Sequence, residues 1–229
     1  MLALLYDVHG NLPALEAVIA DAEAAGADGW ILGGDYALFG GWPAEKVTRL
    51  RTLERASWIR GNGERWTADP DAAPDNAVVP GAIAAAREAL GADVVSDLAS
   101  LPFSCPHDGM LVCHGSPLSD VRSFAAGADA GDDEELLDGT DAPRVLFGHT
   151  HVPFTRTSAG GVELVNPGSV GMPFDGDPRA AYALLAGDGT IEHRRVGYDH
   201  AASAERVRGF GGEWAEVVAR RIERASIDV

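Results

Sequence analysis

Short polar motifs follow several apolar runs along the chain. They contain residue types that bind metals or position phosphate, and they read Asp7-Val8-His9-Gly10-Asn11, Gly33-Gly34-Asp35, Gly61-Asn62-Gly63, His114-Gly115 and Gly148-His149-Thr150-His151. If each apolar run is a strand, each motif lies at a strand's carboxyl end, which is where α/β sheets bind their ligands. The glycines permit sharp turns and close backbone approach there. We therefore expect these side chains to meet in one site.

The donor atoms of these motifs suit transition metals. Aspartate, histidine and asparagine offer oxygen and imidazole nitrogen, and no cysteine lies in the motifs. This set suits Mn, Fe, Zn or Co better than a structural cysteine-type zinc site. Two ions that share a bridging carboxylate can stabilise an in-line phosphoryl displacement. The number of candidate ligands fits two such ions: Asp7, His9, Asp35, Asn62, His114, His149 and His151.

Each motif also has an ordinary structural explanation. Gly-Asn-Gly and Gly-Gly-Asp are common turns, and Asn11 is a good N-cap for a helix that begins at Leu12. A lone His-x-His binds metal in a minority of cases. The conjunction of all the motifs at successive strand ends favours metal ligation over coincidence.

The elements that must position these motifs alternate between apolar runs and helical periods, which predicts an α/β fold. We expect a single domain over residues 1–229. Closely spaced runs after Val152 predict an antiparallel meander, and an apolar stripe near the end predicts a docked helix. The expected strands are 2–6, 29–32, 57–59, 110–113, 144–147, 154–157, 162–165, 180–185 and 191–196. The expected helices are 12–22, 43–53, 80–90, 134–137 and 214–222.

Composition narrows the classes of partner. The chain of 229 residues has 18 Lys or Arg and 35 Asp or Glu, so its formal net charge is −17. This acidity argues against polymeric nucleic acid as a partner. Cys105 and Cys113 are too few for a disulfide framework, although their pairing stays open. The start of the chain shows neither a signal peptide nor a membrane span, so we expect a cytoplasmic protein with no membrane partner. The oligomeric state is not readable.

In their order, the motifs resemble those of calcineurin-like metallophosphoesterases, and most closely the small, single-domain YfcE-like phosphodiesterase branch. Asn166-Pro167-Gly168-Ser169 is also typical of that branch. The resemblance covers essentially the whole chain. It implies a two-layered mixed β-sandwich flanked by helices, with a dinuclear metal centre at one edge. It also implies a metal-dependent phosphodiesterase that acts on a small phosphoester.

The resemblance further implies a role for each candidate. Asp7, His9, Asp35 and His151 would hold the first metal, and Asp35, Asn62, His114 and His149 the second, with Asp35 as the bridge. A hydroxide between the two divalent ions would attack phosphorus. Manganese is favoured, and Fe, Zn, Ni and Co stay open. Asn62, which would position phosphate, and His114 are the catalytic candidates. Asn11 would support a neighbouring group or touch the substrate.

The sequence departs from the family at Gly63. Many members read Gly-Asn-His, and that histidine can protonate the leaving group. Loss of a general acid typically costs ~10²–10⁴-fold, and least for leaving groups that need no proton. Gly63 therefore favours activated phosphodiesters or cyclic nucleotides over a phosphomonoesterase or nucleotide phosphatase. A non-catalytic interaction module on the same fold is the alternative of another class. Polar replacements nearby in sequence are Arg60, Glu64, Arg65 and His107, and Trp42 or Trp66 could stack on a substrate ring.

Overall fold

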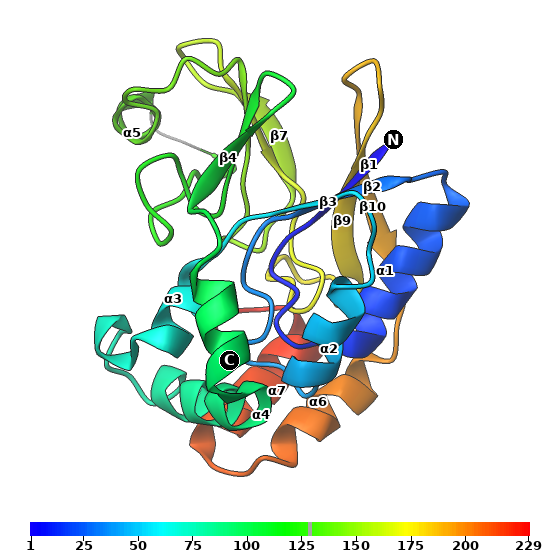
Figure 1. The fold of residues 1–229 in the computed structure, drawn as a ribbon, viewed down its shortest axis with the longest axis vertical. Coiled ribbons are helices and arrows are strands. Elements are labelled where there is room, and N and C mark those ends of the chain that lie inside the picture. Colours follow the sequence, from blue (N-terminus) through cyan, green and yellow to red (C-terminus); the bar gives the residue numbers. More distant parts are fainter. Residues whose placement is uncertain (128–129) are drawn as a thin grey trace.

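Two mixed sheets face each other in the computed structural model, which describes residues 1–127 and 130–229 (Figure 1). Each sheet has five strands. Helices α1 and α2 lie beside the first sheet, α5 lies outside the second, and α6 and α7 lie at the far end of the molecule (Figure 1). The predicted two-layered mixed β-sandwich flanked by helices is confirmed.

The first sheet has the order β10-β9-β1-β2-β3. β1 (Leu2–Leu5), β2 (Gly29–Leu32) and β3 (Ala56–Trp58) run parallel to one another. β9 (Ala180–Leu185) pairs with β1 in the antiparallel sense, and β10 (Ile191–Val196) pairs with β9 in the same sense. The carboxyl ends of the three parallel strands therefore lie at one edge.

The second sheet has the order β4-β5-β6-β8-β7. Its strands are β4 (Ser104–His107), β5 (Met110–Cys113), β6 (Arg144–Leu146), β7 (Phe154–Thr157) and β8 (Glu163–Asn166). β5, β6 and β8 are parallel, whereas β4 and β7 are antiparallel to their neighbours.

The expectation of one meander after Val152 is wrong. The hairpin β7–β8 joins the second sheet and the hairpin β9–β10 joins the first. Spacing along the chain reveals a hairpin turn, but the sheet that a hairpin joins depends on packing between distant segments.

Apolar side chains from both sheets fill the space between them. Leu4, Tyr6, Ile31, Val112 and Leu146 belong to this buried cluster. Because the central strands are covered on both faces, they read as continuous apolar runs instead of alternating patterns.

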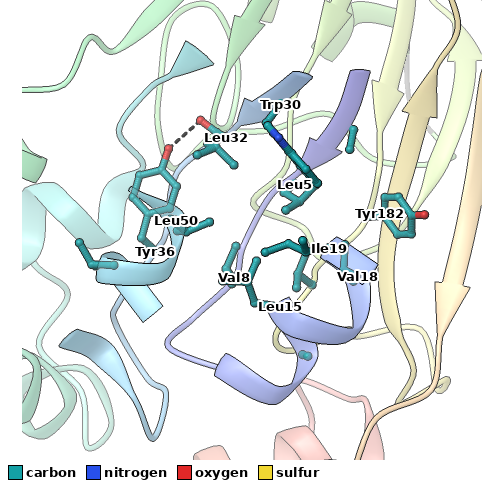
Figure 2. Packing of buried hydrophobic residues seen from close by; sticks show 14 of the residues in the cluster. Leu5, Val8, Leu15, Val18, Ile19, Trp30, Leu32, Tyr36, Leu50 and Tyr182 are labelled. Atoms are coloured by element: carbon teal, nitrogen blue, oxygen red, sulfur yellow. Dashed lines mark hydrogen bonds between the residues drawn. The ribbon is translucent and has the colours of Figure 1, made fainter. Parts of the chain in front are cut away.

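The outer face of the first sheet is covered by α1 (Leu12–Ala24) and α2 (Pro43–Leu50). Figure 2 shows Leu15, Val18 and Ile19 of α1 close to strand residues Leu5 and Tyr182. α1 begins as predicted, because the Asn11 side chain accepts a hydrogen bond from the Ala14 amide at 3.4 Å. Leu15, Val18, Ile19 and Ala22, which share one face of the helix, are buried.

Three helices differ from or extend the prediction. α3 (Asn62–Ala68) begins at a candidate ligand and was not expected as a helix. α4 (Val79–Ala99) is longer than residues 80–90, because the chain continues helically beyond a kink at Gly91, whose φ is 75°. α5 (Ala130–Leu136) covers the second sheet and begins earlier than the short helix expected at 134–137. A single 3-10 turn, Pro70–Ala72, links α3 to α4.

The chain ends in α6 (His200–Arg208) and α7 (Glu213–Arg224), which pack on each other. Val207, Val218 and Ile222 form a buried cluster with Met172, which lies on the segment between β8 and β9. The predicted docked helix is therefore confirmed in α7. Among the helices described, none is both long enough and apolar enough to span a membrane.

Candidate metal centre

All seven candidate ligands lie where strands end. Asp7 and His9 follow β1, Asp35 follows β2, and Asn62 opens the helix after β3. On the second sheet, His114 follows β5, while His149 and His151 follow β6. Only His149 is not fully buried. The site therefore lies at the shared edge of both sheets and draws its side chains from each.

Asp7 lies at the centre of the group. Its Oδ1 is 3.4 Å from Nε2 of His151, 3.7 Å from Nε2 of His114 and 3.8 Å from Nε2 of His9. Asp35 lies beside it, with Oδ1 3.6 Å from Nε2 of His114 and Oδ2 3.9 Å from Nε2 of His9. Two overlapping groups could hold ions: Asp7, His9 and His151, and Asp7, Asp35 and His114.

Asn62 and His149 extend the second group. The side-chain Oδ1 of Asn62 lies 2.9 Å from Nδ1 of His149. The same end of the amide lies 3.0 Å from Nε2 of His114. The side-chain amide of Asn62 thus lies between the ring nitrogens of His114 and His149.

The residues present fit a bound cation. Oδ1 of Asp7 is buried and accepts no hydrogen bond from the described residues. An unpaired buried carboxylate oxygen is costly, and a cation would satisfy it. The facing nitrogens of His9 and His151, 3.0 Å apart, have the same need. The oxygen and imidazole donors match Mn, Fe, Zn or Co.

Main-chain oxygens orient three of the histidines. Nδ1 of His9 lies 3.0 Å from the Leu38 oxygen, Nδ1 of His114 2.8 Å from that of Gly33, and Nδ1 of His151 2.6 Å from that of Met172. A proton on Nδ1 that donates to the carbonyl leaves Nε2 free to bind a metal. Such partners fix the ring orientation of metal-binding histidines.

The backbone at the candidate ligands is strained. Five of the seven have positive φ: Asp7 at 52°, His9 at 45°, Asp35 at 56°, His149 at 67° and His151 at 59°. Non-glycine residues rarely adopt this conformation, which concentrates at functional sites.

Two motif glycines allow the ligands to approach this closely. A Cβ on Gly61 would lie 2.2 Å from Oδ1 of Asp35, and one on Gly148 would lie 2.5 Å from Oδ2 of Asp7. Any side chain at either position would displace a carboxylate. The Gly-Asn and Gly-His motifs therefore carry a packing requirement as well as a turn.

The two carboxylates differ in their affinity for protons. Burial raises the pKa of Asp7, but the charges of His151 and His114 outweigh burial and hold that pKa well below its ordinary value. Burial raises the pKa of Asp35 to about 7, opposed by His114 and reinforced by the charges of Glu64 and Asp7. When no cation is present, Asp35 is therefore the carboxylate of the pair that takes up a proton first as pH falls.

Two of the histidines are neutral at pH 7. Burial lowers the pKa of His9 well below its ordinary value, and the neighbouring His151 lowers it further. Burial, reinforced by His114, lowers the pKa of His149 to about 4. Neutral imidazole is the form that binds metal, so these side chains need not lose a proton first.

The Asn11 side chain forms hydrogen bonds within the protein. Its Nδ2 donates to the Gly171 oxygen at 2.8 Å and to the Tyr198 hydroxyl at 3.0 Å. Its Oδ1 accepts from the Ser203 hydroxyl at 3.1 Å. These contacts favour support of the loop after β1 over contact with a substrate.

Two of the polar residues considered as replacement proton donors, Glu64 and His107, have other surroundings. Glu64 is buried and accepts from the backbone amides of Asp35, Tyr36 and Gly61 at 2.7–2.8 Å. It therefore holds the loop after β2. His107 lies with Met1 in a cavity at the other end of β1.

The aromatic rings that contact candidate ligands in the described part of the chain include two phenylalanines that were not expected. Trp42 lies beneath Arg206, and Trp66 packs against the cluster of α4. Instead, Phe174 stacks on His151 with ring centroids 4.3 Å apart, and Phe39 lies 5.5 Å from His9. Sequence reasoning missed both phenylalanines because neither lies in a polar motif.

Comparison with known proteins identifies the family. The sequence model for the calcineurin-like phosphoesterase superfamily domain matches residues 1–189. The chain belongs to this superfamily. Its members are phosphoester hydrolases that depend on divalent metals, which agrees with the candidate metal-binding groups. The matched residues contain every candidate ligand, whereas α6 and α7 lie beyond them.

Individual relatives agree with this assignment. The chain is 28% identical over 228 residues to the uncharacterised protein MJ0912 of Methanocaldococcus jannaschii, covering 90% of this chain and 91% of that one. It is 26% identical over 199 residues to the phosphodiesterase YfcE of Escherichia coli, covering 82% and 89%. The crystal structure of a metallophosphoesterase from Sphaerobacter thermophilus has a TM-score of 0.82 at 28% identity and covers 98% of each chain.

Proposed function

We propose that this phosphoesterase is a phosphodiesterase that uses two divalent ions, with manganese favoured. The observation that carries the proposal is the convergence of two carboxylates and four histidines with Asn62 at the shared edge of the sheets. Similarity to a phosphodiesterase over most of the chain supports the diester preference. When bound, the ions would supply a hydroxide nucleophile and stabilise charge on the phosphoryl oxygens.

The proposed roles follow from position. Asp7, His9 and His151 hold the first ion, and Asn62, His114 and His149 hold the second. Asp35 bridges the two by analogy with the family, although Asp7 is the carboxylate common to both candidate groups in the structure. Asn62 and His114 face the reacting phosphate, and Asn62 orients it. Asn11 supports the loop that carries His9.

The glycine at position 63 narrows the class of substrate that we propose. No side chain at this position can protonate a leaving group, and Glu64 is occupied by three backbone amides. Diesters with good leaving groups are therefore the expected substrates, in preference to alkyl phosphomonoesters.

The acidic charge of the chain does not oppose an anionic substrate. Only Asp7 and Asp35 are acidic among the seven candidates. Two divalent ions would outweigh their charge and make the local site electropositive. Substrate binding is thus expected to depend on metal occupancy, and a polymeric nucleic acid is not an expected partner.

The decisive experiment measures hydrolysis of bis-p-nitrophenyl phosphate by the protein loaded with manganese. We expect metal-dependent activity that is lost on chelation and in Asp35→Asn. Asp133→Asn, which alters a buried carboxylate paired with Arg156 on another face, is the matched control. A wild-type protein that binds metal yet hydrolyses no aryl diester would overturn the proposal. If the aryl diester is hydrolysed, a panel of 2′,3′- and 3′,5′-cyclic nucleotides would identify the substrate class.

We also propose that residues 1–229 form one domain in the cytoplasm. The buried cluster that joins Met172 to α6 and α7 supports one domain. The unpaired Cys105 and Cys113 are typical of a reducing compartment. Limited proteolysis and cell fractionation test the two statements.

A further inference from the structure

A buried carboxylate lies beside the second candidate metal group. Asp120, which is 6% exposed, lies on the loop between β5 and α5. It accepts hydrogen bonds from Nε and Nη2 of Arg65, both at 2.7 Å, and from Nη1 of Arg60 at 3.1 Å. We call these three residues the Asp120 clasp.

The clasp joins two segments that carry candidate ligands. Arg65 and Asn62 lie three residues apart on α3, and the loop that contains Asp120 begins directly after His114. With the Asn62 amide turned so that its nitrogen faces His114 and His149, that nitrogen donates to the main-chain oxygen of Asp120 at 3.0 Å. Asp120 thus contacts Asn62 through its backbone and α3 through its side chain.

Apolar packing does not explain why Asp120 points inward. Its neighbours Leu118 and Val121 are 53% and 42% exposed, so the apolar side chains of this loop face outward and the acid faces inward. Hydrogen bonds hold the rest of the turn, including one from the Ser116 amide to the Ser119 oxygen at 2.8 Å. The clasp is therefore a main attachment of this loop to α3.

The contact between the Asp120 loop and α3 can fix the distance between two candidate ligands. His114 follows a strand of the second sheet, whereas Asn62 follows a strand of the first. Their separation depends on how the two sheets dock, unless a local contact fixes it. Partners that orient metal ligands typically contribute 10–100-fold to metal affinity.

We propose that Asp120 is a positioning residue for the second metal, and that it fixes Asn62 relative to His114 through the clasp. This inference rests on the proposed function, because it takes Asn62 and His114 as ligands. It predicts an effect on one of the two ions only. Within the described part of the chain, the Asp120 clasp makes no contact with the first candidate group, which consists of Asp7, His9 and His151.

Calorimetric titration of the metal-free protein with Mn²⁺ tests the proposal. Asp120→Ala is expected to weaken the second binding event about 10–100-fold and to leave the first unchanged. Asp120→Asn, which keeps the shape of the side chain, is expected to give a smaller change in the same direction. Asp133→Ala removes another buried carboxylate held by an arginine and should change neither event.

Electron paramagnetic resonance separates positioning from general destabilisation. The manganese-loaded wild type is expected to give a spin-coupled signal from two ions, and Asp120→Ala at the same metal concentration a mononuclear one. Wild-type affinity for both ions in Asp120→Ala, or equal weakening of both, would overturn the proposal. If wild type binds two ions but hydrolyses no diester, the proposed function fails and the inference stands.

Discussion

Nε2 of His9 lies 3.0 Å from Nε2 of His151, and the Nδ1 atom of each ring faces a main-chain oxygen. With Nδ1 protonated on both rings, two lone pairs point at each other across this gap. Oδ1 of Asp7 lies on the same side, 3.4 Å from His151. A cation between these three atoms would remove the repulsion, and metal binding would then be linked to folding stability.

Metal should therefore stabilise the fold. At free Mn²⁺ about 100-fold above its dissociation constant, we expect unfolding to cost about 2.7 kcal/mol more than in chelator. His151→Ala should lose most of this gain. His193→Ala, which changes a histidine on β10 that contacts Thr155, should keep it. Thermal unfolding with and without chelator measures both. An equal gain in the two variants would contradict a role for His151 in binding.

Substitutions at Gly63 test whether a histidine there would supply the missing proton donor. The effect of adding a Cβ at this position must be measured separately. A Cβ at this position would lie 2.9 Å from Oδ1 of Asp35, which accepts a hydrogen bond from the Gly63 amide at 2.7 Å. Gly63→Ala should therefore shift Asp35 and reduce diester hydrolysis about 10-fold. Gly63→His makes the same contact and adds an imidazole.

Gly63→Ala and Gly63→His share the Cβ contact with Asp35, so a difference between them reports on the imidazole. The quantity to compare is the ratio of alkyl phosphomonoester to aryl phosphodiester hydrolysis. We expect this ratio to rise in Gly63→His relative to Gly63→Ala, by up to ~10²–10⁴-fold. Steady-state kinetics with glycerol phosphate and bis-p-nitrophenyl phosphate give the ratio. The same ratio in both variants would show that the histidine is not the group that is missing.

Lys46 predicts a pH dependence of stability. This only lysine of the chain is fully buried, and its Nζ has no hydrogen-bond partner among the described residues. Burial lowers its pKa to about 7 from an ordinary 10.5, against the charges of Glu64 and Asp35. Between these two values the unfolded chain holds more protons than the folded one. Unfolding free energy should thus rise with pH, by up to about 1.4 kcal/mol per unit.

Lys46→Met removes this contribution. We expect the variant to be more stable than wild type at pH 6.5, and the difference to shrink as pH rises from 7 towards 10. Urea unfolding in chelator at pH 6.5, 8 and 9.5 measures it. Arg49→Met on the same helix is the control, because arginine keeps its proton throughout this range. A difference that stays constant with pH would contradict a buried amine with a lowered pKa.

The seven candidate ligands, which the structure brings together, can be located from the sequence for a physical reason. Each lies within a few residues of a strand end, so a local pattern of apolar run, glycine and polar residue locates it. The parallel arrangement of β1, β2 and β3 then brings Asp7, Asp35 and Asn62 to one edge without further information. Strand ends are encoded locally, even though the site is assembled from the whole chain.

The unpredicted features depend on contacts between distant segments. Asp120 reads as an ordinary loop residue, because its partners Arg60 and Arg65 lie 60 and 55 positions away. Lys46 reads as a solvated helix residue until α2 packs against the loop that carries Tyr36, whose ring lies 5.4 Å from Nζ. Neither position carries a local signal of its partners.

The site spans both sheets, and that placement has a mechanical consequence. His9 and His151 are separated by 142 positions in sequence and lie at the ends of β1 and β6, which belong to different sheets. An ion held by both would act as a cross-link that closes a long loop, much as a disulfide does. Amide hydrogens of the two sheets should then exchange with solvent as a single unit when metal is bound.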